Sequence, residues 1–203
     1  DNNTAVGSAA GSAINSGIRN TVIGSIAGDA VTTGRMTTAV GYSALTTVST
    51  NDYNTAVGAY TLSAATGVSN TALGKSAGAL VAAGAYNIML GYQAGDNITS
   101  GDGNVCIGVD ADPSSATGDR QLIIQGSDTS TTTTWITGDS SGNLVFPADV
   151  TLGDDLVLDS DSAVLKFGDD QDTTLTHTDG TGLTLNSTNK LCFYDTALSI
   201  SSS

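Results

Sequence analysis

The stretch NTAVG at residues 3–7 decides the fold, because it returns along the chain at a nearly constant spacing. Variants of this motif occur seven times, and successive copies are 17 residues apart except for one step of 16. The motifs close with Gly7, Gly24, Gly41, Gly58, Gly74, Gly91 and Gly108. A fixed period of this kind is the signature of a repeat architecture in which each unit stacks on its neighbours.

Other positions share the same period. Alanine lies three residues after six of the closing glycines, and Thr61 takes that place in the other repeat. A column of turn residues precedes the motifs by three positions and consists of Gly17, Gly34, Asn51, Gly67, Gly84 and Gly101. These residues predict turns that need a positive φ. Seventeen residues fit one coil of a parallel β-solenoid or β-roll, so seven coils predict a rod segment about 30 Å long.

The motif strand is apolar on both faces, because side chains alternate along a strand. One face carries the bulkier residues, and we expect it to fill the coil interior: Val6, Ile23, Val40, Val57, Leu73, Leu90 and Ile107. The opposite face carries mostly small residues: Ala5, Val22, Ala39, Ala56, Ala72, Met89 and Cys106. A strand that is apolar on both sides must be covered on both sides. We therefore expect the second face to pack on other copies of the chain around a common axis; the alternative is an alanine-rich face exposed to water.

Composition restricts the fold class and the partners. The chain has 203 residues with a formal net charge of −14, and its 20 acidic residues are all Asp. With 25 glycines and no Glu, it lacks the usual residues of helix surfaces and predicts an all-β protein. The six Lys and Arg residues are scattered singly, which argues against a nucleic-acid partner, and no apolar run is long enough for membrane insertion. The chain begins in mid-pattern, so we expect it to be a piece of a longer protein.

A different architecture begins after Asp112. Of 24 alanines, 20 lie in residues 1–112, whereas 13 of the 20 Asp follow. We predict a β-roll repeat domain at 1–112, a β-hairpin connector at 113–149 with short apolar runs around Leu122, Trp135 and Leu144, and a β-shaft at 150–203. Pairs of apolar residues such as Val150/Leu152 give that last segment a thin core. Three copies wrapped as a β-prism or an intertwined triple-β shaft would bury their apolar pairs together around one axis and so form a larger shared core.

The repeated NTAVG run with its following alanine resembles the head repeats of trimeric autotransporter adhesins, which form a trimeric parallel β-roll. It is also similar to NTAVG arrays in tail fibre proteins of tailed, especially marine, bacteriophages. This resemblance covers residues 1–112. GDSSGN at 138–143 and DGTGLTLN at 179–186 resemble the shaft segments of such fibres. The resemblance implies a homotrimer located in the extracellular virion tail, with a C-terminal tip beyond this sequence.

The chemical inventory does not favour an enzyme, a cofactor or a metal. His177 is the one histidine and has no nucleophile pattern around it; a ring of three at a trimer axis is the alternative. Paired acids begin at Asp154/Asp155 and could serve glycoside cleavage or bind calcium, but they fall in predicted turns, where Asp is favoured for local hydrogen bonding. The two cysteines, Cys106 and Cys192, lie far apart in the sequence and do not form a disulfide framework.

Tyrosines supply the weak candidates for receptor binding. Tyr42 and Tyr92 directly follow a closing glycine, and Tyr60 lies one residue further on. They either stack on sugars or cap exposed coil edges.

The sequence therefore predicts a non-catalytic structural and adhesive segment of a trimeric phage tail fibre. Its partners are further copies of itself, other tail proteins and a host cell-surface glycan or protein receptor. The alternatives are the head of a bacterial trimeric surface adhesin and a polysaccharide-depolymerising tail spike. An ice-binding solenoid is more remote, because the threonine column is expected on the same side as the core valines.

Overall fold

The computed structural model describes residues 2–47, 50, 52–128 and 130–153. Every regular element in these residues is a strand, so the all-β prediction is confirmed for this part of the chain. The chain forms two compact units, Asp1–Thr151 and Leu152–Ser203, and all the strands of the described residues lie in the first. The predicted β-prism or triple-β shaft lies outside the described residues apart from its first few positions.

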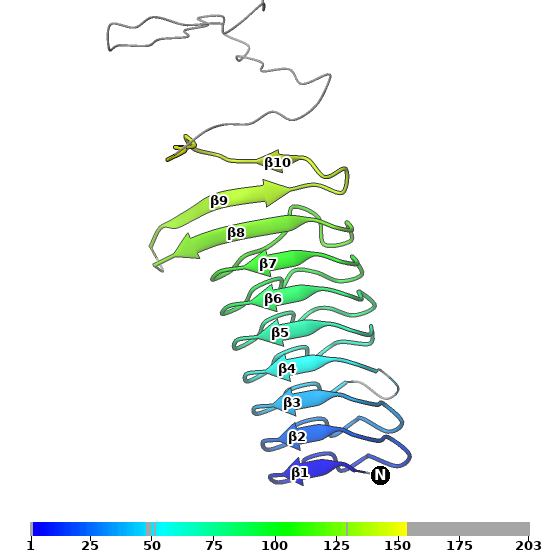
Figure 1. Cartoon of the computed structure of the whole chain (residues 1–203). Helices are drawn as coiled ribbons and strands as arrows, with labels where there is room; N and C mark the ends of the chain where they lie inside the picture. The colour runs from blue at the N-terminus through cyan, green and yellow to red at the C-terminus, as the bar shows by residue number, and fades with distance from the viewer. Residues whose placement is uncertain (1, 48–49, 51, 129, 154–203) are drawn as a thin grey trace, which may run out of the picture. The chain divides into compact units, whose positions relative to one another are not determined.

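Each NTAVG motif forms a three-residue strand, and the strands stack in chain order (Figure 1). The strands are β1 (Thr4–Val6), β2 (Thr21–Ile23), β3 (Thr38–Val40), β4 (Thr55–Val57), β5 (Thr71–Leu73), β6 (Ile88–Leu90), β7 (Val105–Ile107), β8 (Leu122–Ser127), β9 (Thr132–Gly138) and β10 (Leu144–Val145). Pairing is parallel from β1 to β8 and antiparallel from β8 to β10. In this register each motif residue pairs with the residue at the same motif position in the next coil, as in Thr38↔Thr55 and Val40↔Val57. This pairing confirms the β-solenoid of about seven coils.

The prediction for the two strand faces was wrong, because the small face is the coil interior. Val22, Ala39, Ala56, Ala72, Met89 and Cys106 are fully buried within the single chain, so they cannot pack on other copies. Ala5 lies on the same face and is exposed only because β1 is the first strand of the stack. The bulkier residues point outward instead, and Ile23 and Leu73 are 38% and 52% exposed.

Packing volume explains why the small face turns inward. The interior of each coil also receives the alanine column, for example Ala44 and Ala77, and the column of Val31 and Val81, all fully buried. Close packing leaves little room for a third large side chain. Where the strand residue is large, the neighbouring turn position is glycine: a Cβ on Gly28 would lie 2.7 Å from Val22 Cγ1. Beside Ala39 and Ala56 the same turn position carries the buried Leu45 and Leu62.

The glycines before each motif have a different role from the predicted one. Gly17, Gly34, Gly67, Gly84 and Gly101 do not take a positive φ; that conformation occurs two residues later, for example at Arg19 and Met36. A Cβ on Gly17 would instead lie 2.6 Å from the carbonyl oxygen of Gly34 in the next coil. Close backbone approach between coils therefore explains this column.

A buried polar ladder runs along the stack at the first motif position. Asn20, Asn54, Asn70, Asn87 and Asn104 are at most 1% exposed. In one rung, Asn87 Oδ1 accepts the Asn104 backbone N–H at 2.8 Å, and Asn87 Nδ2 donates to the carbonyl of Gly101 at 2.9 Å. Gln121 ends the ladder, because its backbone N–H donates to Asn104 Oδ1 at 2.8 Å. The side-chain amides thus satisfy backbone groups that water cannot reach.

The stack ends in a hairpin formed by the three apolar runs that were expected to make the connector. β8 pairs with β7 in parallel and with β9 in antiparallel orientation, so the solenoid pairing continues past residue 112. Gln125 ties β8 to the preceding coil, since its Nε2 donates to the carbonyls of Val109 and Asp110 at 2.8 and 2.7 Å. β10 completes the sheet through Leu144↔Gly138.

Candidate functional site: the outward face of the motif strands

The outward side of β1–β8 is a continuous uncharged surface, on which five of the sixteen residues are threonines and the rest are aliphatic. We call it the motif face and define it by the outward residues of each strand. One rank contains Thr4, Thr21, Thr38, Thr55, Thr71, Ile88, Val105 and Leu122, and the other contains Val6, Ile23, Val40, Val57, Leu73, Leu90, Ile107 and Ile124. All of these residues are exposed or half-buried in the single chain.

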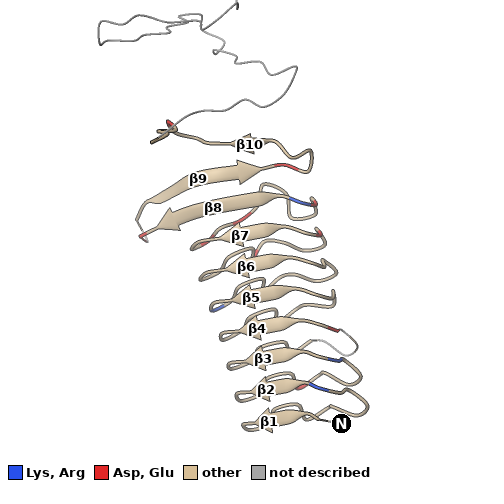
Figure 2. Ribbon diagram, in the orientation of Figure 1, with Lys and Arg blue, Asp and Glu red and all other residues tan. Residues whose placement is uncertain are grey.

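The motif face carries no charge, although the chain as a whole is strongly acidic. None of the strands β1–β8 contains a charged residue, and the charged residues of the described chain lie in the connections (Figure 2). Large uncharged apolar patches are uncommon on monomeric proteins and mark interaction surfaces. Depletion of charge is also the compositional signal of the centre of a protein interface.

The apolar surface continues beyond the motifs into β8 and β9. Ile124 pairs with Ile136, and both are half-buried. Trp135 lies beside the irregularity of this pairing and packs over Gly126, where an added Cβ would be 2.7 Å from the indole ring. Its side chain is 55% exposed, so the described part of the chain does not bury Trp135.

The tyrosines of the described residues lie at the two corners that flank the motif strands. Tyr42 and Tyr60, at the corner after β3 and β4, form an edge-to-face pair with ring centroids 5.3 Å apart. Tyr92 does not join this pair; the Lys75 ammonium lies 5.6 Å from its ring centroid. Tyr53 and Tyr86 lie just before β4 and β6 with positive φ and are also exposed.

Several acids of the described residues accept backbone hydrogen bonds. Asp52 Oδ1 accepts the Arg35 N–H at 2.8 Å, and Asp102 Oδ1 accepts the Ala85 N–H at 2.8 Å. Asp139 binds the side chain and backbone of Asn143, and these hydrogen bonds lower its pKa. No group of three His, Cys, Asp or Glu residues suited to a metal occurs in the part of the chain that the structure describes. His177 and the acids from Asp154 to Asp172 lie outside that part.

Cys106 is not set up as a nucleophile. Its thiol is buried inside the coil, and burial together with the nearby Asp112 raises its pKa to about 12. A thiol is reactive as the thiolate, so this environment keeps Cys106 inert near neutral pH. Asp112 itself is unusual, because burial and the neighbouring Asp96 and Asp110 raise its pKa to about 6.

Acidification should therefore stabilise the coil around Asp112. The protonated carboxyl contributes stability that is fully present below the ordinary pKa of 3.8 and is lost as the pH rises through about 6. Asp112→Asn should raise the free energy of unfolding at pH 7 by about 1 kcal/mol, after allowance for solvent screening, and flatten its slope between pH 4 and 7. Urea unfolding at several pH values measures both quantities.

Asp128→Asn is the matched control. Hydrogen bonds from Thr131 and Ser130 lower the pKa of Asp128, so its stabilising contribution is present above pH 3.8 and is lost on acidification. Asp128→Asn should therefore leave the slope between pH 4 and 7 nearly unchanged and alter it, in the opposite sense, only below pH 4. An unchanged slope in Asp112→Asn would contradict the assignment.

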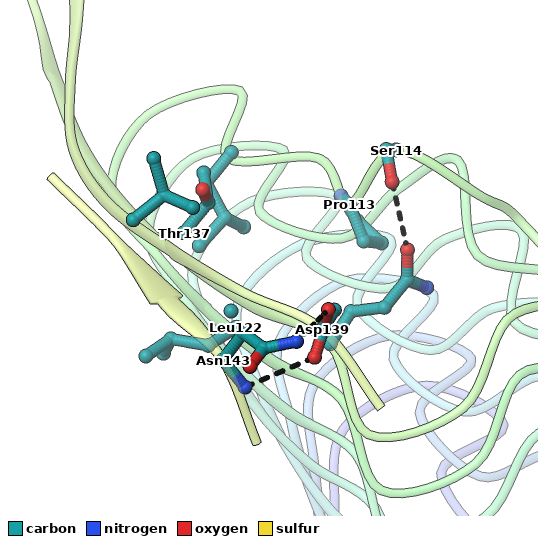
Figure 3. A pocket seen from close by; sticks show the side chains of 10 residues that line it. Pro113, Ser114, Leu122, Thr137, Asp139 and Asn143 are labelled. Atoms are coloured by element: carbon teal, nitrogen blue, oxygen red, sulfur yellow. Dashed lines mark hydrogen bonds between the residues drawn. The ribbon is translucent and has the colours of Figure 1, made fainter. Parts of the chain in front are cut away.

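A cavity of about 210 Å³ lies where β8 meets β9 and β10 (Figure 3). Pro113, Leu122 and Thr137 line it together with Asp139 and Asn143. Its polar side chains bond to one another: Asp139 accepts from Asn143, and Ser114 Oγ donates to Gln121 Oε1 at 3.1 Å. The cavity therefore offers no converging set of free acid, base or nucleophile.

No protein-family model, curated protein or solved structure matches this chain. The described residues also contain no helix of the length and hydropathy needed to cross a membrane.

Proposed function

We propose that this chain is a non-catalytic, adhesive segment of a homotrimeric phage tail fibre, in which the motif faces of three copies pack together. The proposal rests on the uncharged motif face, which runs along eight strands and is not covered by any other part of the chain that the structure describes. Burying such a face removes apolar area from water at about 25 cal/mol per Å². The resemblance of the NTAVG repeats to phage tail fibres and trimeric adhesin heads supports three copies and a location in the virion tail.

The corrected orientation of the strand changes which residues make the contact. Val57 and Leu73 and their neighbours in the same rank replace the alanine face as the packing surface. Small side chains inside the coil keep it narrow, and the branched residues outside supply the area for association. The rod then acts by geometry: it projects identical binding sites to a host surface receptor, and several weak contacts combine into firm attachment through avidity. Other tail proteins are its partners in the virion.

Light scattering and one substitution test the assembly. The wild-type chain should have a mass about three times the 20.2 kDa of one copy. Leu73→Asp places a charge in the centre of the motif face and should yield single chains, because an unpaired buried charge is costly at an interface. Leu80→Asp is the matched control, since Leu80 is 58% exposed but lies in the connection between β5 and β6. Its mass should stay that of three copies.

Two outcomes would contradict this proposal. The first is a monomeric wild-type chain with the far-UV spectrum of folded β-structure. The second is equal dissociation by Leu73→Asp and Leu80→Asp.

The outward threonine column favours one other candidate, an ice-binding surface. Thr4, Thr21, Thr38, Thr55 and Thr71 repeat at the strand spacing of about 4.8 Å on an open sheet, whereas the sequence interpretation placed them beside the core. A face that binds ice must be free, so this candidate needs a monomer. Thermal hysteresis measured on a monomeric wild-type chain, and its loss in Thr38→Tyr, would favour ice binding over the fibre.

A further inference from the structure

Four side chains form a ridge along the corner that follows strands β3 to β6. Tyr42, Lys75 and Tyr92 come directly after the glycines that close β3, β5 and β6, and Tyr60 is the second residue after Gly58, which closes β4. Because successive coils are about 4.8 Å apart, these residues line up over four coils. We call them the aromatic ridge. The ridge follows the tight turns at the arrowheads of these strands (Figure 1).

Contacts within the ridge hold its rings at the surface. Tyr42 and Tyr60 meet edge to face at an interplanar angle of 81°. Lys75 reaches over Tyr92 in a cation–π contact. The three tyrosines nevertheless stay between 44% and 48% exposed. The ridge therefore presents ring surface and hydroxyl groups to solvent without filling a gap in the coil.

The charge of the ridge is opposite to that of the chain. The two residues that follow each closing glycine of β3–β6 include one cation, Lys75, and no acid, although the chain carries 20 Asp. The carboxylate of Asp96 comes near the end of the ridge, where it accepts a hydrogen bond from Gln93 at 3.0 Å. Lys75 is thus a single positive site between aromatic rings on an acidic rod.

We propose that the aromatic ridge binds a glycan that carries carboxylate groups, with sugar rings stacked on Tyr42 and Tyr60 and a carboxylate at Lys75. Tyrosine suits this partner, because its ring packs on the apolar face of a sugar and its hydroxyl bonds to sugar oxygens. The lone cation selects an acidic glycan without giving the clustered charge that nucleic acid or an anionic membrane requires. This proposal rests on the proposed attachment role and names the class of its receptor.

Calorimetric titration of the full chain with carboxylated oligosaccharides tests the ridge. The probes are neutral oligosaccharides that end in one galacturonic, mannuronic or sialic acid residue, each beside a fully neutral oligosaccharide of equal length. Wild type should bind at least one acidic probe more tightly than the neutral oligosaccharide of equal length. Tyr42→Ala/Tyr60→Ala should weaken binding about tenfold. Lys75→Gln should remove the preference over the neutral sugar, and Lys75→Arg should retain it.

Tyr53→Ala/Tyr86→Ala is the matched control, because these tyrosines are more exposed than those of the ridge but lie at the other corner. It should bind like wild type. The mass of every variant is measured in parallel, which separates this proposal from the trimer. Trimeric wild type that binds none of the probes would overturn the ridge alone. Dissociation caused by Tyr42→Ala/Tyr60→Ala would also overturn it, since the ridge would then belong to the subunit contact.

Discussion

Replacing Gly58 by alanine should destabilise the solenoid by at least about 4 kcal/mol, enough to unfold many domains. Gly58 closes β4 with φ +137°, a conformation that L residues rarely adopt. An added Cβ would also lie 2.5 Å from the carbonyl oxygen of Gly74 and 2.6 Å from its carbon. Those atoms are fixed by the ladder, in which the Gly74 N–H donates to the Val57 carbonyl at 2.8 Å. Relieving the clash requires the coils to separate.

Gly142→Ala separates the steric clash from the backbone conformation. Gly142 has φ +85°, but nothing lies within 4 Å of the position of an added Cβ. This control should cost about 1 kcal/mol, the usual penalty for an L residue in such a conformation. Urea unfolding followed by circular dichroism gives both values. Costs that agree within 1 kcal/mol would show that the coils adjust, and close coil contact would not explain the closing glycines.

Strand positions and register could be predicted from the sequence because both follow from the period. Any residue of the motif, such as Thr38 or Thr55, pairs with the same residue one coil later, so the 17-residue spacing gives the register directly. Alternation also gives two faces, but it does not say which face is inward. The choice depends on the volume left by the rest of the coil, and the prediction weighed only the bulk of Val40 against that of Ala39.

Two other columns contained the missing information. Ala44 and Val31 represent inward positions that already fill the coil, so a third bulky column could not fit. The recurring Asn of the motif was a second signal, because a polar residue kept at one position of a stacked coil can bond from coil to coil. The contact between Tyr42 and Tyr60 was harder to predict from the sequence. It depends on side-chain direction at a corner, where Tyr60 has a positive φ, and strand periodicity does not describe that geometry.

Replacing Asn87 by alanine should cost about 3 kcal/mol, because two buried backbone groups lose their partners. The Asn104 N–H loses its acceptor, and the Gly101 carbonyl loses its donor. Asn3→Ala is the matched control: Asn3 makes the same two bonds, to the Asn20 N–H at 2.9 Å and the Gly17 carbonyl at 2.8 Å, but at the half-buried end of the stack. Water can replace these bonds there, so this variant should cost about 1 kcal/mol.

Asn87→Asp distinguishes the bonds of the ladder from the mere size of the side chain. Aspartate keeps an oxygen for the Asn104 N–H but places a carboxylate opposite the Gly101 carbonyl, so burial should raise its pKa above the unfolded value. Its stability relative to wild type should then be lowest at pH 7 and recover toward pH 4, where the protonated carboxyl again donates to Gly101. Urea unfolding at both pH values tests this. A penalty that does not change with pH would mean that Asn87 fills space and that its amide does not bind the coils together.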